Sequence, residues 1–523
     1  MTSLVIMSAY LALLLAVGLV SNRFFRGTAR DYFLASQSIG PVLLVMSVFG
    51  TAMTSFALVG SSGEAYRIGI GVFGTLASWS ALVHVAVFFF VGMRLWAVGK
   101  RHGYVTQIQY FRDRYESDFL GLLLFPILVG LVIPYLLTGL LGARGVVRSM
   151  TQGAFPELFP ATQGAVPPWL TGLVICGVVL VYIFHGGLRG AVWANTFQTC
   201  VFMISGVVAF SMISSKLGGL EAATRKVLEA HPEHLMRGSL ISQIDFLTYG
   251  LIPLSIGTFP HIFQHWLTAR SASTFRLSIV AHPIFMMILW APCVLIGVWA
   301  TSATLPDGSL IVPPGSPPNT ELALMVDRLT TPILGGLLGA GILAAIMSSL
   351  DSQFFCLGTM FTTDIVVHYF GKERFDDRRR VRLARMFIVL IVGVSYLLSL
   401  AEPRGIFTLG VWCFTGFTSL FPLVFLSIYW RRSTKAGAIA SVAVTAAVWV
   451  LLFRDGGYGS NADYKFWGLM PVAINFFASL FTMIVVSLLT RAPSEETLRK
   501  FFLAGPARRA PLREGLAADQ VRG

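Results

Sequence analysis

The feature that most constrains this chain is a series of about thirteen long apolar stretches that contain few charged residues. A helix that crosses a bilayer needs about 20 consecutive, mostly apolar residues, so each stretch predicts one transmembrane helix. The stretches cover residues 2–21, 40–63, 72–93, 119–140, 168–185, 191–213, 245–267, 278–300, 334–363, 386–401, 406–429, 436–453 and 469–490. The sequence therefore predicts an all-α integral membrane protein whose transmembrane domain covers residues 1–490.

Composition excludes a soluble protein. Of the 523 residues, 55% are hydrophobic and only 12% are charged, and the mean hydropathy is +0.73. A soluble domain of this composition could not cover its apolar surface with polar side chains, so the lipid bilayer is the expected partner of that surface. The five cysteines lie in apolar runs without paired spacing, which predicts neither a disulfide framework nor a zinc site.

The basic residues indicate how the chain is oriented in the membrane. If the segment after the first helix is cytoplasmic and the sides alternate, cytoplasmic segments hold 28 of the 39 Lys and Arg residues, including the cluster "KERFDDRRRVRLAR". This bias places the N-terminus outside and residues 491–523 in the cytoplasm as a short basic tail. It also explains the net charge of +14 without nucleic acid. The high content of Ala, Arg and Gly indicates a bacterial inner-membrane protein.

Two polar stretches inside apolar segments are candidates for a binding site. "GILAAIMSSLDSQFF" contains Ser348, Ser349 and Asp351, and a charged side chain costs on the order of 3 kcal/mol at the bilayer centre. "SVFGTAMTSFALVGSSGEAYRIGIG" is dense in Gly, Ser and Thr, which favours an interrupted helix with unpaired carbonyl oxygens. Hydroxyls in membrane helices commonly bond to a carbonyl one turn earlier. Facing an interrupted helix, however, they would form a neutral oxygen cage suited to Na⁺.

Five motifs in this order carry a resemblance to a known family: "RDYFLASQSIGPVLLVMSVFGTAMTS", "FHGGLRGAVWANTFQ", "PHIFQHWLTARS", "AAIMSSLDSQFFCLGTMFTTDI" and "YWRRSTKAGAIAS". The chain resembles the sodium:solute symporter family through nearly its whole length. The resemblance implies the LeuT-type architecture, in which five helices are followed by five more related by inversion. The repeats would cover about residues 40–213 and 245–429, and helices two and seven would be broken.

The resemblance also implies a Na⁺ site between the broken second helix and the ninth helix. Its ligands would be the main-chain carbonyls of Gly50, Met53 and Ala345 and the hydroxyls of Ser348 and Ser349. Asp351 is expected to hydrogen-bond to a neighbouring helix rather than to bind the ion. The chain departs from the family pattern at Asn195 and Ala52, where relatives carry an acidic residue, and both changes remove negative charge from the ion path.

Substrate contacts are predicted around the two breaks and on two further helices. The candidates are Thr54, Ser55, Phe56, His84, Gly257, Trp412 and Thr415. Residues 54–56 would offer backbone N–H groups at the start of a half-helix, where a carboxylate is stabilised. His84 is the only ionisable side chain in the middle of its helix, although an isolated histidine there is more often a packing residue. The aromatic stripe around Trp412 is core packing by default, with a gate or a substrate platform as the alternative.

These features predict a secondary active transporter that uses a Na⁺ gradient to import a small organic solute by alternating access. The sequence shows no membrane-buried cluster of carboxylates and amides, which favours an amino acid or a monocarboxylate over a sugar. The alternative is a solute sensor of the same fold, which would act through a separate signalling partner at the basic inner face. An enzyme is not predicted, because the sequence offers no nucleophile, phosphate loop or metal-binding constellation.

Overall fold

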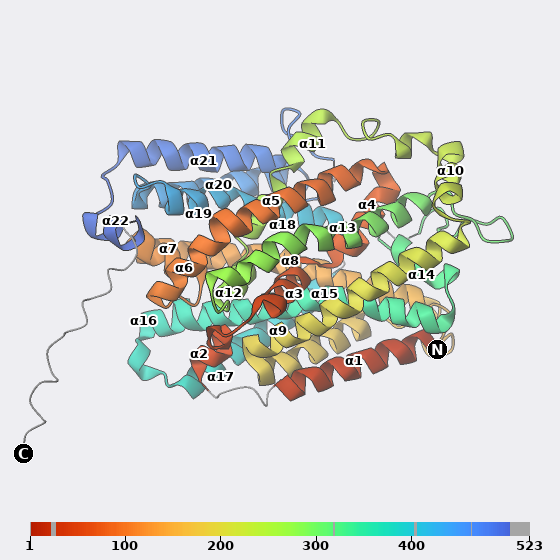
Figure 1. Ribbon diagram of the computed structural model, residues 1–523, viewed down its shortest axis with the longest axis horizontal. Coiled ribbons are helices and arrows are strands. Elements are labelled where there is room, and N and C mark those ends of the chain that lie inside the picture. The colour runs from red at the N-terminus through yellow and green to blue at the C-terminus, as the bar shows by residue number, and fades with distance from the viewer. Residues whose placement is uncertain (1, 22–27, 317–318, 402–404, 462, 503–523) are drawn as a thin grey trace, which may run out of the picture.

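Helices make up nearly all of the structure. The computed structural model describes residues 2–21, 28–316, 319–401, 405–461 and 463–502. Within these ranges the only β structure is a few isolated bridges, so the predicted all-α class is confirmed. Figure 1 shows the long helices running side by side along the longest axis of the molecule. The α-helices are α1 (Thr2–Ser21), α2 (Ala29–Leu34), α3 (Pro41–Ala52), α4 (Ser61–Ile68), α5 (Trp79–Val87), α6 (Met93–His102), α7 (Gln107–Arg114), α8 (Asp118–Thr151), α9 (Pro168–Lys216), α10 (Leu220–Ala230), α11 (Gln243–Tyr249), α12 (Pro260–Leu267), α13 (Phe275–Trp299), α14 (Glu321–Leu329), α15 (Pro332–Met360), α16 (His368–Phe370), α17 (Asp377–Leu400), α18 (Ile406–Ser419), α19 (Phe421–Tyr429), α20 (Lys435–Asp455), α21 (Pro471–Leu489) and α22 (Glu495–Phe502).

The described part of the chain has ten helices long and apolar enough to cross a membrane, or up to twelve when two bent helix pairs are each counted as one span. The predicted count of thirteen is not confirmed. It differs because α9 runs for 49 residues where the sequence predicted two spans, 168–185 and 191–213. A straight helix of 49 residues would be about 73 Å long, far more than the roughly 30 Å of a hydrocarbon core, so α9 does not form one continuous span. Gly187 has non-helical dihedrals (φ 55°, ψ −152°) and divides α9 between these two stretches.

Both predicted helix interruptions are present. α3 ends at Ala52, and the helix that resumes at Phe56 is bent by 59° relative to it. Between them, Met53 has an extended backbone (φ −87°, ψ 102°). The pair Gln243–Gly257 and Pro260–Leu267 is bent by 49°. A proline stands at the first position of α12, where its fixed φ suits a helix start and its missing N–H costs nothing.

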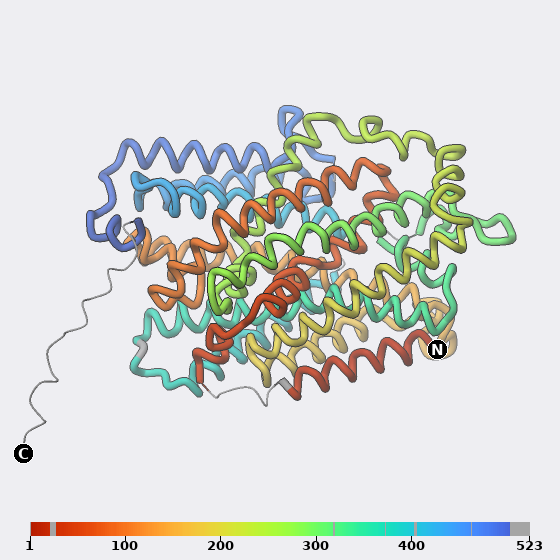
Figure 2. Tube along the Cα trace, viewed as in Figure 1, coloured from red at the N-terminus to blue at the C-terminus, as the bar shows by residue number. Residues whose placement is uncertain are grey.

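α15 lies at the centre of the bundle. In its most apolar window, 83% of the residues are buried within the protein, against 28% for α1. It packs against α9, α8, α1 and α17, and glycines let these neighbours approach closely. A Cβ on Gly336 would meet Ile6 of α1, and one on Gly358 would meet Ile388 of α17. Figure 2 shows α3 in the middle of the molecule, where it contacts α15, α9 and α13.

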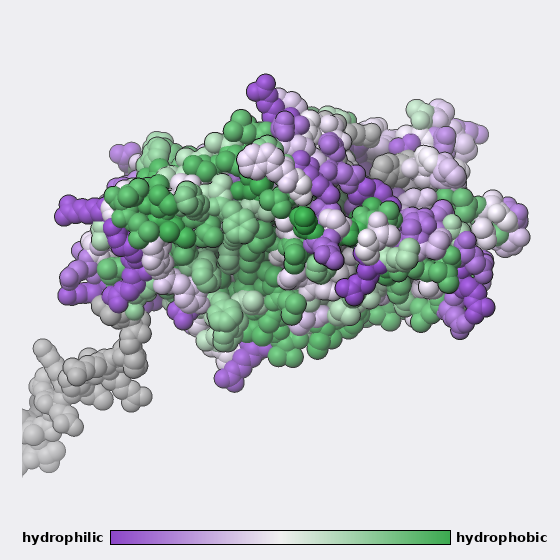
Figure 3. Space-filling view, turned by 90° about the horizontal axis from the view of Figure 1, so that it is seen from above, coloured by the Kyte–Doolittle hydropathy of each residue, from purple (hydrophilic) through white to green (hydrophobic). Residues whose placement is uncertain are grey.

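The surface fits a protein surrounded by lipid. Large apolar side chains such as Leu82, Leu397 and Phe481 are more than 60% exposed along the helices. Figure 3 shows a broad hydrophobic surface along the molecule, with many hydrophilic residues toward its two ends. In Figure 1, α7, α16 and α22 lie at one end, while the N-terminus, α10 and α14 lie at the other. Which end is cytoplasmic stays a prediction from the charge bias.

Candidate functional site

The first candidate site lies where α3 stops beside α15. Because α3 ends at Ala52, the carbonyls of its last turn lack the N–H groups of a following turn. The Ser348 hydroxyl of α15 lies 2.7 Å from one of these carbonyls, Gly50 O, and 2.8 Å from Ala345 O. All three residues are buried. Three of the five predicted Na⁺ ligands therefore lie together, with two carbonyl oxygens in contact with the Ser348 hydroxyl.

The other two predicted ligands take different positions. Ser349 Oγ donates to Ile346 O at 3.0 Å, one turn earlier in its own helix. Met53 lies one turn after Gly50 and lines a buried cavity beside the break. The structure thus brings Gly50, Ala345 and Ser348 into direct contact, whereas Ser349 bonds within its own helix.

The chemistry of this group fits a small hard cation. Its candidate ligand atoms are two carbonyl oxygens and one hydroxyl oxygen, and hard cations prefer oxygen ligands. None of these three oxygen ligands carries a charge, so Na⁺ would bind weakly enough to dissociate again. The Ser348 hydroxyl now donates its hydrogen to a carbonyl. A bound cation requires this hydroxyl to rotate, so that a lone pair faces the ion.

Gly50 allows α3 to approach α9 closely. A Cβ at this position would lie nearer to Thr199 Oγ1 than real Cβ contacts allow, and 3.3 Å from Asn195 O. Only glycine fits between the two helices without a shift. The position of the Gly50 carbonyl beside Ser348 therefore depends on contacts on both sides of α3.

A network of buried polar side chains continues from this group around Ser352 of α15. Its hydroxyl lies 2.9 to 3.0 Å from four partners: Thr51 Oγ1, Asp351 Oδ1, Asn195 Nδ2 and His265 Nε2. A hydroxyl has one hydrogen and two lone pairs, so at most three of these four bonds form at once. Tyr182 OH donates to Asp351 Oδ2 at 3.1 Å, and this is a hydrogen bond to a neighbouring helix of the kind predicted for Asp351.

The network gives a physical reason for asparagine at position 195. Its side-chain amide donates to Thr51 Oγ1 at 2.8 Å and to Ser352 Oγ at 3.0 Å. A carboxylate cannot donate either bond. An aspartate here would also lie close to Asp351, which shares the Ser352 hydroxyl. The amide therefore suits a chain that already holds a buried carboxylate on α15.

We expect Ser352→Ala to lower the stability of the protein, because it removes the hydroxyl that these buried groups share. Each unpaired buried polar group costs about 1–3 kcal/mol. The melting temperature in detergent measures the loss. Ser395→Ala is the matched control, since Ser395 is equally buried and its hydroxyl has no hydrogen-bond partner among the described residues. Equal melting temperatures for the two variants would contradict the prediction.

A second candidate site is a buried cavity of about 40 Å³ beside the break in α3. Three predicted substrate residues, Thr54, Phe56 and His84, line it together. The rest of its wall is mainly aromatic and aliphatic, with Tyr135, Tyr249, Phe259, Trp290 and Phe414 as its large members. No Asp, Glu, Lys or Arg lies among the described lining residues. The cavity is too small for an organic solute, so side chains must move apart before one enters.

The remaining predicted substrate residues lie elsewhere. Ser55 Oγ donates to Thr138 O of α8 at 2.5 Å. Gly257 packs against Phe421, and Thr415 is buried without lining the cavity. Trp412 faces α20, where its ring packs on Trp449 and Phe453. The structure therefore groups three of the seven predicted residues around one cavity and separates the other four from it.

Several lining residues were not predicted. Tyr135 and Trp290 stand in apolar helices and Phe259 stands in the apolar segment directly before α12, where an aromatic residue is indistinguishable from core packing by sequence alone. Trp290 makes one polar contact, because its indole N–H donates to Ala57 O at 2.5 Å, close to the break after α3. His84 is not isolated, since its Nδ1 lies 3.1 Å from Nε2 of His282 on α13. Both histidines were visible in the sequence, but their pairing depends on how α5 meets α13.

Known transporters match this chain over nearly its whole length. The high-affinity proline transporter PutP of Bacillus subtilis (strain 168) is 26% identical over 483 residues, which cover 90% of this chain and 95% of the relative. The sodium/proline symporter of Staphylococcus aureus (strain bovine RF122 / ET3-1) is 25% identical over 504 residues, covering 94% and 93% of the two chains.

Solved structures share the fold. A Na⁺-coupled sialic acid symporter in a substrate-bound outward-open state superposes with a TM-score of 0.76 and 18% identity, covering 94% of this chain and 99% of that one. Mhp1, a nucleobase-cation-symport-1 family transporter, gives a TM-score of 0.57 at 14% identity, with 89% and 97% coverage. The model of the sodium:solute symporter family matches residues 32–444. The chain belongs to the sodium:solute symporter family.

Proposed function

We propose that this protein imports a small organic solute by coupling it to the inward movement of Na⁺. The observation that carries the proposal is the Ser348 hydroxyl, which joins Gly50 of the broken helix to Ala345 of α15. These oxygens fit a Na⁺ site, with Ser349 and Met53 as further ligands after a local rearrangement. The membrane potential contributes about 2.3 kcal/mol per 100 mV to the inward movement of each Na⁺ ion.

Ion binding and solute binding would act on the same break. Na⁺ would hold the end of α3 against α15, while Thr54 and Phe56, directly after α3, line the cavity for the solute. Ordering of the break by one ligand lowers the free-energy cost of ordering it for the other, which makes their binding reciprocal. Alternating access would then follow from movement of the broken helices relative to the rest of the bundle.

The cavity favours an amino acid or a monocarboxylate over a sugar. Its described lining is rich in aromatic rings and holds no carboxylate or amide side chain that would bond several hydroxyls. At the start of the half-helix, the N–H groups of Phe56 and Ala57 bond to Thr54 Oγ1 and Thr54 O at 3.1 and 3.0 Å, and a carboxylate that replaced Thr54 as their acceptor would be stabilised there. The named relatives transport proline, which is consistent with a small carboxylate-bearing solute.

Melting temperatures of the purified protein test this function. The protein is heated with amino acids, monocarboxylates and sugars, each in NaCl and in KCl. The expected result is a solute that stabilises the protein in NaCl and much less in KCl, because a ligand of the folded state raises stability by mass action. The same solute should accumulate in proteoliposomes under an inward Na⁺ gradient. Binding without accumulation would favour the sensor alternative instead.

A further inference from the structure

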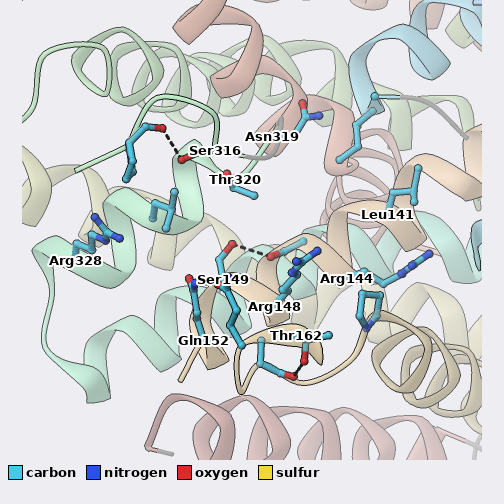
Figure 4. Close-up of a pocket in the computed structure, with 18 residues that line it drawn as sticks. Leu141, Arg144, Arg148, Ser149, Gln152, Thr162, Ser316, Asn319, Thr320 and Arg328 are labelled. Carbon is cyan, nitrogen blue, oxygen red and sulfur yellow. Dashed lines mark hydrogen bonds between the residues drawn. The ribbon is translucent and has the colours of Figure 1, made fainter. Parts of the chain in front are cut away.

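A larger cavity opens at the end of the bundle that holds the N-terminus, α10 and α14. Its volume is about 550 Å³. Arg144 and Arg148 line it from α8, and Arg328 lines it from α14. Figure 4 shows Arg148 beside Ser149 and Gln152, with Arg328 on a separate helix. The charge bias of the loops predicts this end to be the outer one, so a solute would enter here.

The described residues that line this cavity carry charges of one sign only. No Asp or Glu lies among its described lining residues, and Glu321 and Asp327 of α14 are not part of the lining. Arg148 is exposed and has no hydrogen-bond or ion-pair partner among the described residues. Arg328 donates to Ile311 O at 3.0 Å and interacts electrostatically with the adjacent Asp327, so its charge is partly offset, whereas that of Arg148 is not offset by a described carboxylate. A cleft lined by one sign of charge concentrates ions of the opposite sign.

The arginines are unusual for the side on which they stand. Only 11 of the 39 basic residues fall on the predicted outer side, and three of these 11 line this one cavity. Hydroxyl and amide groups of Ser149, Gln152 and Asn319 add neutral hydrogen-bond partners around them. Arginine forms bidentate hydrogen bonds with carboxylates, and neutral donors nearby extend such a site.

The cavity leads toward the solute site. Leu141 lines the larger cavity and Tyr135 lines the buried one. The two residues are six positions apart on α8, which is about 9 Å along the helix. Between the two cavities, the Phe56 ring stacks on Phe407, with ring centroids 5.1 Å apart, and meets Phe414 edge-on at 4.9 Å. Ile406, the neighbour of Phe407, lines the outer cavity. These aromatic rings separate the open cavity from the closed one.

We propose that the outer cavity is an anion-collecting entry site, and that the transported solute is a small organic anion with a carboxylate and no compensating cationic group. Arg148 and Arg328 attract the carboxylate before the rings around Phe56 part. The proposal rests on the proposed transport function and narrows its solute from amino acids or monocarboxylates to the anionic class. It concerns the path of the solute and not the ion site at Ser348.

A chemical probe tests the field of the cavity without knowledge of the solute. Ser149→Cys is prepared in a Cys200→Ser background, since Cys200 is exposed and the other four cysteines are buried. The rates of modification by an anionic (sulfonatoethyl) and a cationic (trimethylammonioethyl) methanethiosulfonate are compared with those of a free thiol. We expect a preference of about tenfold for the anion. Arg148→Gln should reduce the preference several-fold, and Arg237→Gln, which removes an exposed charge from the same end outside the cavity, should leave it unchanged.

Matched solutes test the chemical class. The melting temperature is measured with propionate and propionamide, lactate and lactamide, and benzoate and benzamide, with L-proline as the zwitterion. At least one acid should stabilise the protein more than its amide and more than L-proline, and Arg148→Gln should weaken the effect about tenfold in apparent affinity. No anion preference in either experiment, or a preference unchanged by Arg148→Gln, overturns the proposal. Stabilisation by an acid that is equal in NaCl and KCl would instead overturn the Na⁺ coupling and leave the anion site intact.

Discussion

Ser348→Ala is expected to shift the Na⁺ dependence of solute uptake to much higher Na⁺ concentrations. The substitution deletes the hydroxyl that contacts both Gly50 O and Ala345 O, and with it one of the predicted ion ligands. A bond to a charged group contributes about 1.5–3 kcal/mol, so the affinity for Na⁺ should fall roughly 10- to 100-fold. Solute uptake into proteoliposomes, measured over a range of external NaCl concentrations, should show this shift. The Ser348→Ala, Ser349→Ala double variant should show no Na⁺ dependence.

Ser441→Ala is the matched control for this variant. Ser441 is also buried, and its hydroxyl also bonds between two helices, to Ser479 Oγ at 2.9 Å, but it lies on α20 and far in sequence from the break. Its variant should lose a comparable amount of stability and keep the Na⁺ dependence of the wild type. If Ser348→Ala transports with an unchanged Na⁺ dependence, the ion site does not lie at the junction of α3 and α15.

The first candidate site could be predicted in large part because its signals are local. Gly, Ser and Thr residues around position 50 weaken a helix within one segment, and the structure breaks the helix there. Gly50 belongs to that segment, while Ala345 and Ser348 lie one turn apart on one face of α15. The spacing of residues along one helix therefore predicts which of them share a face of that helix. The meeting of α3 with α15 came from the family resemblance and not from spacing.

The solute cavity could be predicted only in part, because its wall depends on which helix faces meet. Trp412 and Phe414 are two residues apart, so they point to different sides of α18. Phe414 meets Phe56 at the cavity, whereas Trp412 meets α20. Periodicity indicates that α18 is buried on several sides but does not identify the neighbour on each side. The same limit hid the pairing of His84 with His282.

Gly50→Ala is expected to impair both stability and transport. The new Cβ would overlap Thr199 Oγ1 and crowd Asn195 O, so α3 and α9 must separate. Overpacking of this kind costs about 1–3 kcal/mol, while replacement of a helical glycine by alanine gains at most about 1 kcal/mol. The shift also moves the Gly50 carbonyl away from Ser348. We therefore expect a lower melting temperature and a weaker response of uptake to Na⁺.

A second substitution tests whether the effect of Gly50→Ala comes from the contact of the new Cβ with Thr199 Oγ1, and not from alanine at a helical glycine in general. Thr199→Ala removes the atom nearest to the new Cβ, although it also deletes the bond from Thr199 Oγ1 to Met46 O, 2.9 Å long. The Gly50→Ala, Thr199→Ala double variant should therefore lose less stability than the two single variants lose in sum, because residues in contact do not contribute independently. Gly177→Ala on α9 is the control, since a Cβ there meets no atom within 4 Å. Strictly additive losses in the double variant would mean that the approach of α3 to α9 does not set the position of the Gly50 carbonyl.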